Sequence, residues 1–127
     1  MKTFVLISRI LLGLTFLVFG LNGFLHFIPS PAPTGIAGQY VGALFASHYL
    51  SVVFGFEIIA GVLLLANRFV PLALAILAPI LVNIALFHAL MAPHGYGPAT
   101  LAFALWAVLF HRERSVFSGL WAAKGTI

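Results

Sequence analysis

Residues 49–91, YLSVVFGFEIIAGVLLLANRFVPLALAILAPILVNIALFHALM, decide the fold of this protein. The segment holds two apolar runs, at about 49–66 and 69–91, which are joined only by Asn67 and Arg68. A helix needs roughly 20 apolar residues to cross the hydrocarbon core of a bilayer. Each run is therefore long enough for one crossing, and the segment predicts two consecutive transmembrane helices.

The flanking sequence adds two more apolar runs, at about 4–27 and 99–111. The second of these is short for a full crossing, so we expect the helix to extend at its ends or the bilayer to thin around it. Residues 39–47 suggest a short helix in the membrane interface, and 115–124 an interfacial tail with apolar residues at helical spacing. The predicted fold is all-α: a polytopic membrane four-helix bundle with short loops, built as one domain from residues 1–127.

Composition excludes the other classes of protein. Apolar residues make up 63% of the chain and charged residues 6%, whereas soluble domains contain about 25% charged residues. Disorder requires low hydrophobicity and high net charge. The absence of cysteine excludes a disulfide, a thiolate metal site or a thiol relay within this chain. The net charge of +4 does not indicate nucleic-acid binding, because the cations are scattered beside the predicted spans.

The cations predict the orientation in the membrane. All of them lie at the amino end, between the second and third spans, or at the carboxyl end, and the other two connections have none: Lys2, Arg9, Arg68, Arg112, Arg114 and Lys124. Loops rich in Lys and Arg stay in the cytoplasm. We therefore expect both termini on the cytoplasmic side of a bacterial inner membrane.

Polar side chains inside the predicted spans are the candidate site, because polar groups in lipid are paired or functional. The rise of a helix places Glu57 near the bilayer centre, and the lean of the side chains brings Asn83 to the same level. Asn22 and His88 lie nearer the outer surface. We expect Glu57 beside Asn83, with Asn22 and His88 above them, in a ligand pocket between the first three spans that opens to the outside.

Arg9 is a further candidate ligand residue and the obvious partner for Glu57. Helix rise places it only about 8 Å into the first span, and its side chain leans toward the cytoplasm, where it can snorkel to the headgroups. Tilting of the helices could still form a direct salt bridge. Without that bridge, desolvation favours the neutral acid at Glu57, and both alternatives stay open.

Three segments resemble DoxX-type membrane proteins: SRILLGLTFLVFGLNGFLHFIP at 8–29, FEIIAGVLLLANRFVPLAL at 56–74 and PILVNIALFHALMAP at 79–93. Arg9, Gly20, Glu57 and Gly61 match the pattern of that family. The resemblance implies a four-helix bundle of the bacterial inner membrane. It also implies an association with thiosulfate:quinone oxidoreductase or with complexes that respond to oxidative stress.

The functional prediction combines the polar residues with this resemblance. We expect a redox-associated accessory subunit, not an enzyme on its own, that holds a quinone-like or other small hydrophobic-polar ligand. Electron-transfer groups would come from a partner in a membrane redox complex. The alternatives are a small-solute or proton-coupled permease acting as a homo-oligomer, and a structural assembly subunit. A haem b held by His26 and His88 is a further alternative. No metal site is predicted.

Overall fold

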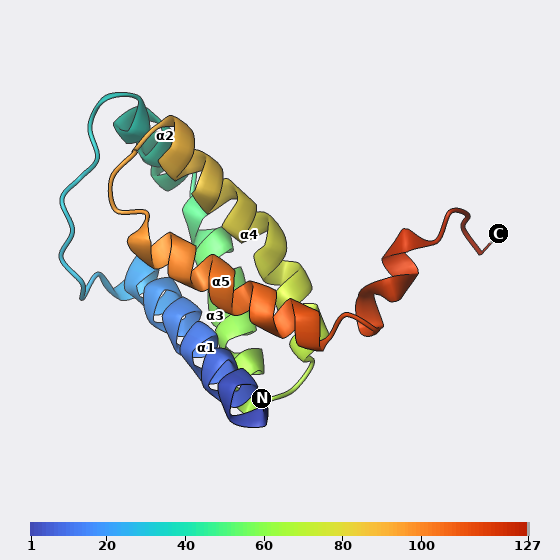
Figure 1. The fold of residues 1–127 in the computed structure, drawn as a ribbon. Helices are drawn as coiled ribbons and strands as arrows, with labels where there is room; N and C mark the ends of the chain where they lie inside the picture. Colours follow the sequence, from blue (N-terminus) through green and yellow to red (C-terminus); the bar gives the residue numbers. More distant parts are fainter. Residues whose placement is uncertain (127) are drawn as a thin grey trace.

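The computed structural model describes residues 1–126 and contains helices but no strand among them (Figure 1). Its three long helices are α1 (Lys2–Leu25), α3 (Tyr49–Ala66) and α4 (Val70–Leu90), and each is long and apolar enough to cross a membrane. The shorter elements are α2 (Gly35–Ala46), α5 (Gly97–Arg112) and the 3-10 helix η1 (Val116–Trp121). The predicted all-α helical membrane bundle is thus confirmed.

Helices α1 and α3 lie side by side along most of their length because glycines remove the side chains between them. A Cβ atom added to Gly61 would lie 2.7 Å from the main-chain nitrogen of Leu17 and 2.8 Å from the carbonyl oxygen of Gly13. A Cβ atom added to Gly20 would lie 3.0 Å from the carbonyl oxygen of Phe54. Small residues at such crossings let two membrane helices approach closely, and here they fix the position of α3 against α1.

Leucines fill the centre of the bundle, where α1, α3, α4 and α5 meet. Leu12, Leu64, Leu74, Leu77 and Leu109 have no more than 1% of their surface exposed. The outer faces of the long helices are also apolar, since side chains as large as Phe and Leu are exposed along them. A soluble protein rarely exposes apolar surface on this scale, so the outer surface suits lipid.

Helix α5 is the fourth member of the bundle and packs against both α1 and α4. It has 16 residues, which corresponds to about 24 Å. The expected extension is present, because the helix begins two residues before the predicted 99–111 and ends one residue after it. The indole Nε1 of Trp106 donates a hydrogen bond of 2.9 Å to the carbonyl oxygen of Leu74 on α4.

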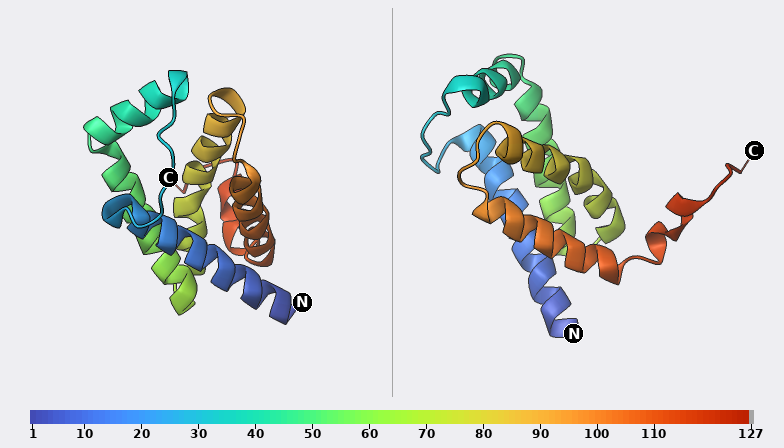
Figure 2. Two further views of the ribbon diagram at one scale, coloured as in Figure 1. Left: turned by 90° about the vertical axis from the view of Figure 1, so that its left-hand side faces the viewer. Right: turned by 45° about the horizontal axis from the view of Figure 1, so that its top comes forward.

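Helix α2 crosses the end of the bundle where α3 begins and α4 ends (Figures 1 and 2). It is longer than the predicted 39–47, since it begins at Gly35. The first span ends at Leu25 rather than at residue 27, because His26 adopts the left-handed conformation that terminates the helix.

The carboxyl-terminal segment departs from the prediction of a regular helix over 115–124. Only Val116–Trp121 is helical, and its geometry is 3-10, a form that seldom continues beyond a few residues. The segment projects away from the bundle (Figures 1 and 2). Trp121 is 82% exposed, whereas the ring centroid of Phe117 lies 5.0 Å from that of Phe110 on α5. Only the start of the segment therefore packs against the bundle.

Candidate functional site

A cavity of about 260 Å³ lies beneath α2, between α3 and α4. Helix α2 contributes Tyr40 to its lining, α3 contributes Glu57, and α4 contributes Asn83 and His88. The remaining lining is aliphatic or aromatic. Three of the five predicted ligand residues, Glu57, Asn83 and His88, therefore share one cavity.

Glu57 is the buried acid of this cavity. Only 6% of its surface is exposed, because the same face of α3 carries Ala60, Gly61 and Leu64 into the bundle. Its carboxyl oxygen Oε2 is buried, and among residues 1–126 it has no hydrogen-bond partner. An unpaired buried polar group costs folding free energy of about 1–3 kcal/mol. The unpaired oxygen of Glu57 at the cavity wall is therefore available for a hydrogen bond with a molecule in the cavity.

Asn83 does not form the expected bond with Glu57. Its Nδ2 donates a hydrogen bond of 3.0 Å to the carbonyl oxygen of Pro79, one turn earlier in α4. The acceptor four residues back is always within reach of a short amide side chain, so it competes well against an acceptor on another helix. Asn83 is exposed on the outer side of α4 and stands at the margin of the cavity.

His88 links α4 to the connection that follows it. Its Nδ1 lies 3.1 Å from the carbonyl oxygens of Ala92 and of His94. A carbonyl oxygen can only accept, so Nδ1 carries the hydrogen, and in the neutral ring Nε2 is the acceptor. The imidazole therefore offers a hydrogen-bond acceptor to a ligand while it fixes the connection between α4 and α5.

Asn22 lies outside the cavity lining, so its predicted place beside His88 is wrong. Its Oδ1 accepts a hydrogen bond of 2.7 Å from the main-chain nitrogen of Ile28. This contact follows from the early end of α1, which leaves main-chain groups of the next residues in need of partners. Through this hydrogen bond, the side chain stabilises the start of the proline-rich connection to α2.

Arg9 also lies outside the cavity lining, and of the two alternatives left open by the sequence, residues 1–126 show the one without a salt bridge to Glu57. Its guanidinium donates to the carbonyl oxygens of Leu64 and of Leu65, the second at 3.3 Å. Seven residues separate Glu57 from Leu64, or about 10 Å along the helix. The carboxyl end of α3 attracts the cation because its last carbonyls have no partner within the helix and carry partial negative charge.

Tyr40 is a cavity residue that sequence reasoning missed. Its ring stacks on that of Phe87, with centroids 5.8 Å apart and 29° between the planes. This contact fastens α2 over the end of α4 and closes the cavity on that side. A tyrosine in a short apolar helix gave the only signal, since such residues carry a polar group at the end of a large apolar ring.

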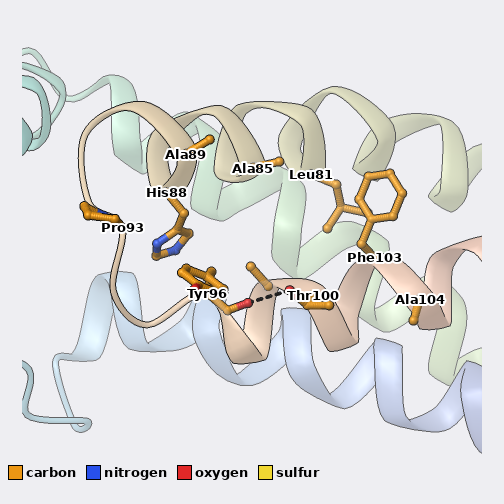
Figure 3. Close-up of a pocket in the computed structure, with 10 residues that line it drawn as sticks. Leu81, Ala85, His88, Ala89, Pro93, Tyr96, Thr100, Phe103 and Ala104 are labelled. Carbon is orange, nitrogen blue, oxygen red and sulfur yellow. Dashed lines mark hydrogen bonds between the residues drawn. The ribbon is translucent and has the colours of Figure 1, made fainter.

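A second cavity, of about 630 Å³, lies between α4 and α5 (Figure 3). Small residues such as Ala85 and Ala104 leave this space, and His88 stands over it near Tyr96. The hydroxyl of Thr100 is used within α5, where it donates a hydrogen bond of 2.8 Å to the carbonyl oxygen of Tyr96. The lining is mostly apolar, so this space offers fewer polar contacts than the Glu57 cavity.

The two histidines of the haem alternative occupy different surroundings. His26 is exposed beside α2, with its ring 6.2 Å from that of Phe45, and it does not line the cavity that holds His88. Within residues 1–126, no three His, Asp or Glu side chains gather as metal ligands would. The carboxyl of Glu57 and the imidazole of His88 remain the groups with ligand-binding chemistry.

Comparison of this chain with protein-family models, with curated proteins and with solved structures finds no match.

Proposed function

We propose that this protein binds a small amphipathic molecule, of the quinone class, in the cavity beneath α2. The observation that carries the proposal is the Glu57 carboxyl, which is buried at the cavity wall with an oxygen that no other group in residues 1–126 satisfies. A ligand carbonyl could accept a hydrogen bond from the neutral acid. Such a contact would offset the cost of keeping that oxygen dry.

The rest of the lining supports a flat, apolar ligand. Phe54, Phe87 and Tyr40 present aromatic surface, which favours stacking on another ring. His88 offers an acceptor nitrogen, so a reduced ring that carries a hydroxyl could bind as well as an oxidised one. Drug-sized ligand sites begin at about 300 Å³, and the present cavity is about 260 Å³. The space favours a single substituted ring.

The wider role that we propose is that of an accessory subunit. A DoxX-like protein of the bacterial inner membrane, with both termini in the cytoplasm, would hold its ligand near the outer surface. A partner in a membrane redox complex, or a second copy in a homo-oligomer, would stand beside it. The flavin, haem or metal for electron transfer would belong to the partner, and the present chain would position the quinone.

The test compares the only two acids of the chain, Glu57 and Glu113. We expect Glu57→Leu, in lipid nanodiscs, to weaken binding of a substituted benzoquinone about tenfold, because one hydrogen bond in a dry site is lost. Glu57→Gln keeps a hydrogen-bond donor at this position and should bind the benzoquinone more tightly than Glu57→Leu. Glu113→Gln is the control, since Glu113 lies beyond the end of α5.

Stability separates this proposal from a structural role. A ligand-binding Glu57 is an unsatisfied group in the free protein, so Glu57→Leu should leave stability unchanged or raise it. A structural Glu57 would instead be needed for assembly, and its loss would destabilise the bundle. Unchanged benzoquinone binding in Glu57→Leu would refute the proposal.

A further inference from the structure

A hollow of about 500 Å³ runs along the outer side of α3 and α4, and we refer to it as the lateral groove. Val52 and Phe56 on α3 and Ile76 and Pro79 on α4 line the groove but not the Glu57 cavity. Apart from Tyr49 and Asn83, its lining is wholly apolar. The groove is open on its outer side, where Val52 is 61% exposed.

The lateral groove adjoins the Glu57 cavity. Four residues line both spaces: Tyr49, Val53, Ile80 and Asn83. At this junction Asn83 donates to the carbonyl oxygen of Pro79, which holds its amide against its own helix. These side chains form the border between the Glu57 cavity and the surface that suits lipid.

The opposite side of the Glu57 cavity is covered. Helix α2 lies over it, and the Tyr40 ring stacks on Phe87 there. A ligand that entered between α2 and α4 would meet this contact. A ligand dissolved in the bilayer would reach Glu57 along the lateral groove without moving α2.

Building on the proposed function, we infer that the ligand is a tailed molecule whose ring occupies the Glu57 cavity and whose hydrocarbon chain leaves through the lateral groove into the bilayer. The cavity of about 260 Å³ holds a ring but has no space for a long chain. The apolar groove would supply that space beside the cavity, on a side that α2 does not cover. The ligand class is thus a lipid-soluble quinone with an alkyl or isoprenoid chain.

The experiment uses two probes with one ring: a dimethoxy-methyl-benzoquinone without a side chain, and its homologue with a decyl chain. Val52→Trp fills the groove at a residue that does not line the ring cavity. We expect it to weaken binding of the decyl homologue in nanodiscs about tenfold, because the chain and the indole cannot share the space. Binding of the ring without a chain should not change.

Val62→Trp is the matched control, since it places the same side chain at another exposed valine of α3, outside both spaces. We expect it to change the binding of neither probe. Ile76→Phe narrows the groove from α4 and serves as the second variant if Val52→Trp does not fold. It should show the same selective loss of the decyl homologue.

The outcomes distinguish this inference from the proposed function. If the wild type binds neither probe, both fail. If binding depends on Glu57 but the groove variants affect both probes equally, or affect neither, only the tail path is refuted. If Val52→Trp changes the oligomeric state measured by cross-linking in the same nanodiscs, without selecting against the decyl homologue, the groove is an interface between copies of the chain and the inference is wrong.

Discussion

The two sides of α3 differ in how closely they meet their neighbours. Against α1, Gly61 lets the main chains approach so closely that an added Cβ atom would lie 2.7 Å from the nearest main-chain atom. Toward α4 and α2, the cavity and the lateral groove leave space for a ligand. Glu57 lies on the buried face of α3 that also carries Gly61, yet its side chain reaches the open side.

This difference shows how a small bundle can keep a cavity without losing its fold. The close-packed pair of α1 and α3 is rigid. Side chains of this pair that reach the cavity are therefore held in fixed positions. Helices α2 and α4 can then stand off from α3 at one end. The position of Glu57 depends on the closed side, whereas the size of its cavity depends on the open side.

The largest expected effect comes from breaking the closed side with Gly61→Ala. The added methyl group meets main-chain atoms of α1 at Leu17 and Gly13, which cannot rotate away, so the helices must separate. We expect a loss of about 3 kcal/mol in the free energy of unfolding, measured by denaturation in mixed micelles.

Gly55→Ala is the control for this prediction. Gly55 lies on the same helix, and a Cβ atom there would have no neighbour within 4 Å. Alanine is the better helix former, so the variant should be as stable as the wild type or slightly more stable. Equal losses in the two variants would mean that the close approach of α1 and α3 does not hold the bundle together.

A smaller loss is expected when the closed side is opened at its other end by Arg9→Met. The variant keeps an unbranched apolar stem but removes the donors to Leu64 and Leu65. A hydrogen bond that involves a charged group contributes about 1.5–3 kcal/mol. The bond to Leu65, at 3.3 Å, is long and adds little, so we expect a total loss of about 2 kcal/mol.

Benzoquinone binding should persist in Arg9→Met, because Arg9 is about two turns of α3 away from Glu57. Arg112→Met is the control, since Arg112 is exposed in the last turn of α5. A collapse of benzoquinone binding in folded Arg9→Met would show that Arg9 acts on the site after all.

The fold could be predicted from the sequence because the signal is large and local. The apolar runs and the break at Asn67–Arg68 determine where the membrane-spanning helices lie in the sequence. Neither signal depends on how the helices pack against one another. The ends of the helices could not be predicted as closely. The left-handed conformation of His26 ends α1 early, and nothing in the hydropathy of neighbouring Phe27 and Ile28 signals it.

The site could be predicted only as far as helix rise reaches. Rise and lean predicted the levels of Glu57, Asn83 and His88, and these residues share a cavity. Helix rise does not tell how each helix is rotated about its axis, so it does not predict the hydrogen-bond partners of these side chains. Asn83 bonds within its own helix, and Arg9 bonds to main-chain carbonyls. Every residue has a main-chain carbonyl oxygen, so the sequence does not indicate which of them accepts a hydrogen bond from a given side chain.

The smallest expected effect concerns the contact between α4 and α5, to which the indole of Trp106 contributes. Trp106→Phe removes the hydrogen bond to the carbonyl oxygen of Leu74 but keeps an aromatic ring against Phe110. One neutral hydrogen bond contributes about 1 kcal/mol, and we expect a loss of that size. Trp121→Phe, at a residue that is 82% exposed, should cost nothing. If the two variants lost equal stability, α5 would be held against α4 by apolar packing alone.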